Sequence, residues 1–289
     1  MAQRKLTVLV LGASGMLGNA VFRVLAASQA LRTFGSVRST SARRFFAPDT
    51  HAALLAGLDV CNSDTLTEVL GKVRPDVVIN CVGVVKQLLA LQNPLDILPV
   101  NALFPHRLAQ LCALSGARLI HFSTDCVFSG DKGLYVESDV ADTHDLYGLS
   151  KLLGEIPDKE AITLRTSIIG HELEGNHGLV EWFLSQQQPV NGFVNAVFSG
   201  LPTVEVARVI RDYILPNSEL RGLYHLAAEP ISKHDLLKLI RAQYGKTVEI
   251  TPCETPMLDR SLNGGKFSLA TGYKAKPWPD LLQSMHEFH

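Results

Sequence analysis

The stretch Leu6-Thr-Val-Leu-Val-Leu-Gly-Ala-Ser-Gly-Met-Leu-Gly18 decides the fold. Its first half, residues 6–11, is a continuous run of strand-forming residues, typical of a strand buried on both faces of a parallel sheet. A loop with three glycines follows, and residues 16–27 then space their apolar side chains as a helix does. The stretch therefore predicts a strand, a glycine loop and a helix, the unit that opens a doubly wound α/β domain.

The same alternation continues along the chain. Strands are predicted at residues 32–38, 53–60, 76–82, 117–122 and 162–168, with helices at 64–73, 94–115 and 145–156 between them. The later pattern is looser, with helices expected at 179–187, 203–215 and 232–244 and a strand at 222–227 that returns to the main sheet. We predict a Rossmann-type α/β fold, with a cofactor-binding domain over residues 1–168 and a smaller, interleaved C-terminal substrate lobe over residues 169–289.

Composition excludes several classes of function. The 27 basic and 28 acidic residues nearly cancel, so neither nucleic acid nor a membrane surface is an expected partner. The apolar run near the start is too short to span a bilayer, and no cleavage site for a signal peptide follows it. The five cysteines lack the spacing of a metal site or a disulfide framework, so we expect no metal, reduced thiols and a cytoplasmic location. They are Cys61, Cys81, Cys112, Cys126 and Cys253.

The glycine loop predicts a dinucleotide site. Gly12 would allow the tight turn, Gly15 the close approach of the backbone, and Gly18 close packing of helix on strand. The start of a helix also attracts the negative charge of a pyrophosphate. The predicted contacts of this loop are Gly12, Ser14, Gly15, Met16, Leu17 and Gly18. A glycine-rich turn without a ligand is the alternative.

The end of the second predicted strand indicates which cofactor is preferred. NAD sites usually place a carboxylate there, but residues 32–47 contain no Asp or Glu. Arg38 and Ser39 stand there instead, and a guanidinium is suited to a ribose 2'-phosphate. We therefore predict NADP(H) in preference to NAD(H). Arg43 and Arg44 could equally belong to a solvated basic loop.

Two further strand ends complete the predicted cofactor cleft. Asp59 and Val60 are expected to meet the adenine, and Cys81, Val82 and Gly83 to line the cofactor cleft. Carboxyl ends of parallel strands gather at one edge of a sheet, which is why these positions are candidates. Ordinary packing at a strand end is an equal alternative for each.

Tyr147 and Lys151 predict the chemistry. Four residues apart on a helix, they share one face, so the ammonium could lie near the phenol and lower its pKa. A phenol tuned in this way can exchange a proton while a nicotinamide exchanges hydride with a ketone or alcohol. Thr124, at the end of another predicted strand, could donate a hydrogen bond to the substrate oxygen. On their own, the tyrosine and the lysine could also be a solvated helix face.

The motifs together resemble an extended short-chain dehydrogenase/reductase, and within it the dTDP-4-dehydrorhamnose reductase group. The likeness covers nearly the whole chain and rests on residues 12–18, 123–130, 147–155 and 164–167, with weaker support at 200–203 and 222–225. It implies Thr124, Tyr147 and Lys151 as the catalytic trio, with Asp125 beside the substrate. It also implies reduction, at C4, of a 6-deoxy keto-sugar linked to a nucleotide, in deoxysugar or surface-glycan biosynthesis.

Two departures from that group concern the sugar pocket. Cys126 stands where the group usually has an aromatic residue, and residues 143–145 replace its usual Pro-x-Asn. A different keto-sugar or a different nucleotide is therefore expected. Cys126 itself is interpreted as a small apolar filler, because no histidine is placed to activate it. The acidic residue that dehydratases carry after Asp125 is missing, which favours reduction over elimination.

The second lobe should hold the nucleotide diphosphate. Arg260 is the best candidate cation, with an ion pair to Asp259 as the alternative, and Trp182 could stack on a base or simply pack in the core. Lys86 could reach the substrate or lie in solvent. A homodimer is possible. Two other functions stay open, an epimerase that retains NAD and a non-catalytic NADP-binding regulatory subunit.

Overall fold

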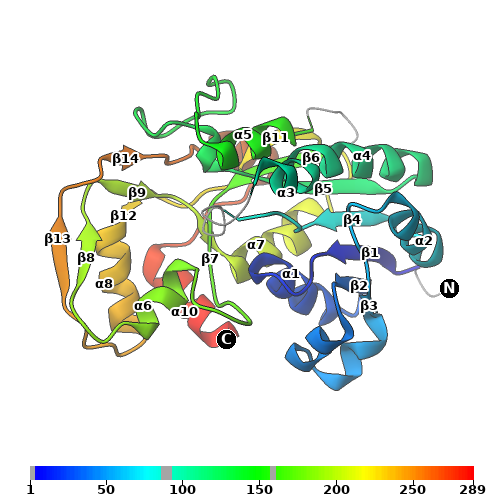
Figure 1. Cartoon of the computed structure of the whole chain (residues 1–289), viewed down its shortest axis with the longest axis horizontal. Coiled ribbons are helices and arrows are strands. Elements are labelled where there is room, and N and C mark those ends of the chain that lie inside the picture. The colour runs from blue at the N-terminus through cyan, green and yellow to red at the C-terminus, as the bar shows by residue number, and fades with distance from the viewer. Residues whose placement is uncertain (1–3, 86–92, 157–160) are drawn as a thin grey trace.

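A seven-stranded parallel sheet forms the centre of the computed structural model, which describes residues 4–85, 93–156 and 161–289 (Figure 1). Its order is β11-β6-β5-β4-β1-β2-β3. The predicted α/β fold with its doubly wound sheet is confirmed. The strands are β1 Leu6–Leu11, β2 Leu31–Val37, β3 Leu54–Ala56, β4 Val77–Asn80, β5 Arg118–Thr124, β6 Ala161–Thr166 and β11 Gly222–His225.

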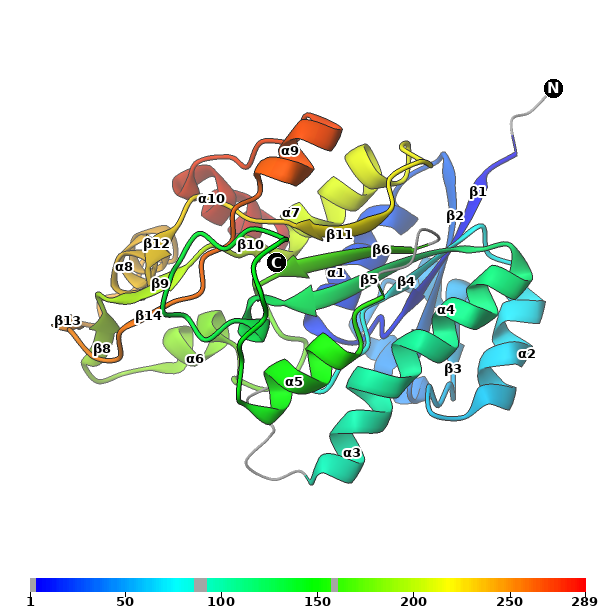
Figure 2. The same ribbon diagram turned by 90° about the horizontal axis from the view of Figure 1, so that it is seen from above.

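Helices cover both faces of this sheet, and the alternation of side chains along β1 shows how. Val8 and Val10 belong to one apolar cluster, whereas Leu9 and Leu11 belong to another on the opposite face. The first cluster includes α1 Met16–Ala26 and α7 Thr203–Val209, and the second includes α2 Ser63–Val73 and α4 Phe104–Ser115. Figure 2 shows α2 and α4 on one side of the sheet and α7 on the other.

Several boundaries differ from the prediction. Strand β3 ends at Ala56, not at residue 60, because Gly57 follows with φ +86° and turns the chain away. The helix predicted at 94–115 is built from α3 Pro94–Leu98, a π-helical turn Pro99–Leu103 and α4. The helix predicted at 203–215 is likewise α7 followed by a π-helical turn, Ile210–Ile214. The helix predicted at 145–156 is α5 Leu146–Leu153.

The second lobe, residues 169–289, contains more elements than predicted. Helices α6 Leu179–Ser185 and α8 Lys233–Gln243 are two of the expected ones. Small sheets join β10 to β7, β13 to β8, and β12 and β14 to β9. The remaining elements are β7 Ile168–Ile169, β8 Val190–Phe193, β9 Ala196–Phe198, β10 Leu201–Pro202, β12 Ile231–Ser232, β13 Ile250–Cys253, β14 Leu258–Asp259, α9 Gly265–Thr271 and α10 Trp278–Phe288. Helices α9 and α10 were not predicted.

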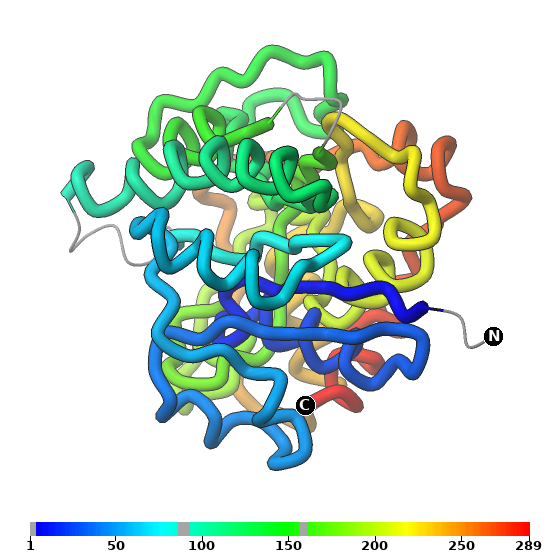
Figure 3. Tube along the Cα trace, turned by 90° about the vertical axis from the view of Figure 1, so that its right-hand side faces the viewer, coloured from blue at the N-terminus to red at the C-terminus, as the bar shows by residue number. Residues whose placement is uncertain are grey.

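The second lobe is interleaved with the first. The strand expected at 222–227 is β11, which pairs in parallel with β6 at the edge of the main sheet. Arg118 of β5 donates hydrogen bonds to the carbonyls of Ile214 and Leu220, which precede β11. The end of α10 returns to α1, where Arg23 donates to the Phe288 carbonyl at 3.1 Å. Figure 3 shows the C-terminal end of the chain beside its N-terminal part. Within the described ranges, no helix is long and apolar enough to cross a membrane.

Candidate active site

The glycine loop between β1 and α1 has the backbone shape expected of an anion site. Gly12 has φ +79°, and its amide donates to the Ser36 hydroxyl of β2 at 3.1 Å. A Cβ on Gly18 would lie 2.0 Å from the Gly12 carbonyl oxygen, so only glycine permits this approach of helix to loop. Helix α1 begins after Gly15 with no side-chain cap and no acidic residue in its first turn. Its N-terminus therefore suits a phosphate group.

The end of β4 connects this loop to Lys151. A Cβ on Gly12 would lie 3.0 Å from the Val82 side chain, and one on Gly83 would lie 3.9 Å from the Lys151 ammonium. Cys81 donates its backbone amide to the Leu11 carbonyl. Residues predicted from two separate motifs thus lie close together at the carboxyl edge of the sheet.

The basic residues after β2 divide into two kinds. Arg38 is exposed immediately after β2. Ser39 stands just before the 3-10 helix Thr40–Phe45, without a capping hydrogen bond from its side chain. Arg44 instead forms an ion pair with Glu174, in the loop that follows β7. The last residue of that loop, Gly178, lies against the first residue of α1. A Cβ on Gly178 would meet the Met16 side chain at 2.8 Å. The loop 170–178 therefore runs past the start of α1.

Asp59 lies beyond β3 and not at its end. Its carboxylate accepts the Cys61 amide at 2.9 Å, and its carbonyl accepts the Thr65 hydroxyl, so it shapes the turn into α2. Val60 packs at the edge of the cluster beneath that helix. A role for either residue toward an adenine stays a prediction.

Tyr147 and Lys151 both lie on α5. Asp145 caps this helix by accepting the Gly148 amide at 2.7 Å. The helix start is pressed against the loop after β5, because a Cβ on Gly148 would lie 2.2 Å from the Cys126 carbonyl oxygen. Lys151 is buried and donates to the Phe122 carbonyl of β5 at 2.7 Å. This packing fixes the helix that carries both residues against the strand that ends at Thr124.

Thr124 and Asp125 lie where β5 ends. The Thr124 hydroxyl accepts the Cys126 amide and donates to the Asp125 carboxylate, both at 3.1 Å. Burial raises the pKa of Asp125, and the hydrogen bonds from Cys126 and Thr124 and the charges of Arg260 and Lys233 oppose that rise. The charges of two cations of the second lobe thus act on the Asp125 carboxyl group.

The pKa of Tyr147 lies above its usual range, against the sequence-based expectation. Burial is the main cause, and the charges of Cys126, Asp125 and Asp145 act in the same direction, while a hydrogen bond with the Thr124 side chain lowers the pKa. The helical spacing of Tyr147 and Lys151 gave no information on these acidic neighbours. The phenol is therefore protonated at neutral pH, which suits an acid.

The pKa of Lys151 is lowered to about 8 by burial, and the charges of Glu155 and Cys81 act in the opposite direction. An ammonium in this state carries its charge through most of the neutral range. It loses that charge as the pH rises through about 8, since a cation with a lowered pKa deprotonates earlier than an exposed lysine.

Arg260 is directed toward Asp145 at the start of α5 and not toward Asp259. Its guanidinium lies 3.7 Å from the Asp145 carboxylate and donates to the Cys126 sulfur at 3.5 Å and to the Ser129 carbonyl at 3.3 Å. Asp259 accepts the Ser261 amide instead. The structure therefore places Arg260 and Cys126 together beside the start of α5.

The other predicted substrate residues have different positions. Trp182 lies on α6, where it packs at the edge of the large apolar cluster, as an ordinary core residue does. Lys86 lies outside the described residues. Lys233, at the start of α8, was not singled out from the other cations of the second lobe. Its charge nevertheless lowers the pKa of Asp125 against the effect of burial.

Asn101 was missed by sequence reasoning. It lies in the π-helical turn between α3 and α4, is 1% exposed, and exchanges hydrogen bonds with the amide and carbonyl of Val84. Its amide also donates to the Ser150 hydroxyl of α5 at 3.1 Å. Asn101 thus holds the segment after β4 against α5. The sequence did contain one signal for Asn101, because it is a polar residue within the apolar pattern of the helix predicted at 94–115.

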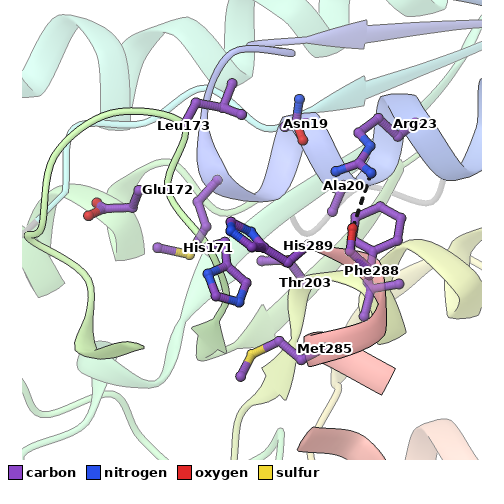
Figure 4. A pocket seen from close by; sticks show the side chains of 12 residues that line it. Asn19, Ala20, Arg23, His171, Glu172, Leu173, Thr203, Met285, Phe288 and His289 are labelled. Atoms are coloured by element: carbon purple, nitrogen blue, oxygen red, sulfur yellow. Dashed lines mark hydrogen bonds between the residues drawn. The ribbon is translucent and has the colours of Figure 1, made fainter. Parts of the chain in front are cut away.

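A cavity of about 60 Å³ lies away from the trio, between α1, the loop after β7 and the end of α10 (Figure 4). Met16, Asn19, Arg23, His171 and Phe288 are among the residues that line it. Met16 connects it to the cofactor loop, but Thr124, Tyr147 and Lys151 do not line it. The cavity therefore does not mark the catalytic centre.

Comparison with known proteins agrees with this geometry. A dTDP-4-dehydrorhamnose reductase of Aggregatibacter actinomycetemcomitans is 25% identical over 256 residues, which cover 80% of this chain and 87% of that protein. A probable low-salt glycan biosynthesis reductase, Agl14 of Haloferax volcanii, is 33% identical over 165 residues, and the chain spans about half of its length, 52%. The crystal structure of dTDP-4-dehydrorhamnose reductase from Bacillus anthracis in complex with NADP has a TM-score of 0.80 at 20% identity, and the match covers 99% of this chain and 100% of that one. The family model described as RmlD substrate binding domain matches residues 6–277, and the chain belongs to this family.

Proposed function

We propose that this protein reduces a keto group, at C4, of a nucleotide-linked 6-deoxy keto-sugar with NADPH, in the biosynthesis of a deoxysugar for a glycan. The observation that carries the proposal is the meeting of Thr124, Tyr147 and Lys151 beside the glycine loop at one edge of the sheet. The relatives named above as reductases support the same reaction class.

The residues present fit NADPH. The close approach of Gly12 and Gly18 and the uncapped start of α1 suit a pyrophosphate, and Arg38 suits a 2'-phosphate. Val82 and Gly83 would line the nicotinamide half of the cleft, with Lys151 holding the ribose. When bound, the cofactor supplies hydride to the ketone carbon.

The chain's own residues supply the proton and the orientation. The Thr124 hydroxyl would turn its proton from the Asp125 carboxylate to the ketone oxygen and orient that oxygen. The Tyr147 phenol would give its proton to the same oxygen as negative charge develops. The raised pKa of Tyr147 supports a phenol that holds its proton until the ketone oxygen takes it. An epimerase that begins by oxidising an alcohol would need Tyr147 as a base, and the same burial opposes this role.

The diphosphate of the substrate would meet cations of the second lobe. Arg260 and Lys233 both act on the pKa of that carboxyl group, so a site beside Asp125 has compensating positive charge from the second lobe. Arg260 also contacts Cys126, where an aromatic side chain would be larger. We propose that Arg260 and Lys233 hold the diphosphate and that Cys126 borders the sugar.

A cytoplasmic location and a homodimer remain predictions. The reduced thiols expected of the five cysteines are the reason for the first, and size-exclusion chromatography with light scattering would test the second.

The test is the loss of NADPH absorbance with dTDP-, UDP- and GDP-linked 4-keto-6-deoxy sugars, with the Tyr147→Phe variant beside the parent protein. One substrate should turn over, and Tyr147→Phe should lose at least about 100-fold in kcat, the usual contribution of a general acid. Its NADPH affinity, measured by fluorescence, should stay within about twofold. An unchanged kcat in Tyr147→Phe would remove the phenol from the reaction.

A further inference from the structure

Three neighbouring strands place one polar residue each in the same row of the sheet. The register pairs Ser123 of β5 with Arg165 of β6, and Arg165 with His225 of β11. All three residues are buried, with exposed fractions of 5%, 4% and 0%. A buried guanidinium needs a counter-charge. It comes from Glu155, which lies just after α5.

The Glu155 carboxylate joins α5 to the two strands. Its two oxygens accept hydrogen bonds from the Arg165 guanidinium, at 2.7 and 2.8 Å, and one of them also accepts a hydrogen bond from the Ser123 hydroxyl at 2.6 Å. The fork geometry makes this a strong, well-oriented pair. His225 closes the row, with its Nε2 3.4 Å from Arg165 and its Nδ1 2.9 Å from the Tyr135 carbonyl.

The row lies next to the groups assigned to catalysis. Ser123 stands between Phe122, whose carbonyl accepts the Lys151 ammonium, and Thr124. Glu155 follows Lys151 by four residues. The carboxylate therefore ties the strand that carries Thr124 to the helix that carries Tyr147 and Lys151.

We propose that Glu155, held in place by Arg165, is a positioning residue for the catalytic lysine: it fixes β5 against α5 and supplies the negative charge that keeps Lys151 protonated. This inference rests on the proposed function, because it takes Lys151 as part of the reaction.

The charges around Lys151 support this role. Glu155 and Cys81 both raise the pKa of Lys151 against the effect of burial, and burial raises the pKa of the Cys81 thiol, so that the thiol is neutral. His121 of β5 also faces Lys151, and burial lowers its pKa, so that its ring is neutral as well. Tyr147, on the same helix, is protonated. Glu155, which forms an ion pair with the Arg165 guanidinium, is then the anion among these groups that favours the ammonium.

The first experiment measures Lys151 directly and needs no substrate. In protein labelled with ¹³C at lysine Cε, the Lys151 resonance is identified by its loss in Lys151→Arg, and its pH titration is recorded. Glu155→Gln should lower the midpoint by about one pH unit, the effect of removing a nearby opposite charge. Ser123→Ala is the matched control, because it removes a hydrogen bond to Glu155 and keeps every charge, so its midpoint should equal the parent's.

Turnover adds a second readout. With the parent midpoint at about 8 and the variant one unit lower, Glu155→Gln should lose about fivefold in kcat at pH 8 and almost nothing at pH 6. A loss that is equal at both pH values would indicate a structural role only and would overturn the proposal. So would an unchanged NMR midpoint, or an equal fall of the midpoint in Ser123→Ala.

Glu155→Gln leaves the Arg165 guanidinium buried without its carboxylate partner, so the single variant could fail to fold. A second variant therefore tests the same proposal. The double variant Glu155→Gln/Arg165→Met removes both charges, and its Lys151 midpoint should also lie below the parent's. If no keto-sugar turns over with the parent protein, the reductase proposal fails while the NMR midpoint still decides the role of Glu155.

Discussion

Gly18 is the residue at which the cofactor loop tolerates least change. A methyl group there would lie 2.0 Å from the Gly12 carbonyl oxygen, which is backbone and cannot rotate away. We predict that Gly18→Ala weakens NADPH binding by about 10- to 100-fold, since forcing atoms into such a contact costs about 1–3 kcal/mol. Fluorescence titration with NADPH measures the change.

Gly71 of α2 provides the control, because a Cβ there meets no atom within 4 Å. Gly71→Ala should keep NADPH affinity and raise the free energy of unfolding by about 0.5–1 kcal/mol, the usual gain within a helix. Equal NADPH affinity in the two variants would contradict the assignment of the loop.

Single residues could be predicted where a local motif carries the information. The glycine loop and the pair Tyr147 and Lys151 are such cases, because turn geometry and helical spacing act over a few residues. The partners of Arg260 could not be predicted, since Cys126 and Asp145 lie more than 100 residues away in sequence and meet it only in the fold. The raised pKa of Tyr147 was missed because its main cause is burial, which the fold sets and helical spacing does not reveal.

At the scale of elements, the start of α5 controls where Tyr147 lies. The Asp145 carboxylate caps this helix through the Gly148 amide and lies 3.7 Å from Arg260. We predict that Asp145→Ala lowers the free energy of unfolding by about 1 kcal/mol. It should also lower kcat, because Tyr147 lies in the first turn of α5 and loses its fixed position when that turn unwinds.

A cap elsewhere separates these two effects. Asn62 caps α2 by accepting the Asp64 amide at 2.9 Å, away from the trio. Asn62→Ala should cost a similar free energy, measured by urea unfolding, and leave kcat unchanged. If Asp145→Ala lowers stability alone, the cap does not position Tyr147.

Elements were predictable where hydrophobic periodicity is long. β1, β5 and α1 match their predicted ranges within two residues. Short strands such as β10 and β14 hold two residues each and contain no period to detect, so only tertiary contacts define them. α10 is a different case, because buried Trp278, Leu281 and Met285 follow helical spacing that was not used.

At the scale of the whole molecule, the two predicted parts share one core. The large apolar cluster joins Val8 and Phe22 of the first part to Val204, Leu236 and other residues of the second lobe. β11 completes the main sheet from the second lobe. Independent domains have separate cores and few contacts across their boundary, which is the opposite of this arrangement. The division at residue 168 stays a prediction about function and not about folding units.

We therefore expect the chain to unfold in a single cooperative transition. Unfolding the second lobe alone would expose the side of α1 that packs on α7, and it would remove β11 from the edge of β6. The first part would therefore lose part of its apolar core and one strand of its sheet. Pulsed hydrogen exchange along a urea series, read by mass spectrometry, separates the parts because peptides from β1 and α1 are distinct from those of α8 and α10. The same urea midpoint for all four is expected of one cooperative unit. A separate, earlier loss of protection in α8 and α10, with β1 still protected, would mean that the second lobe unfolds as its own domain.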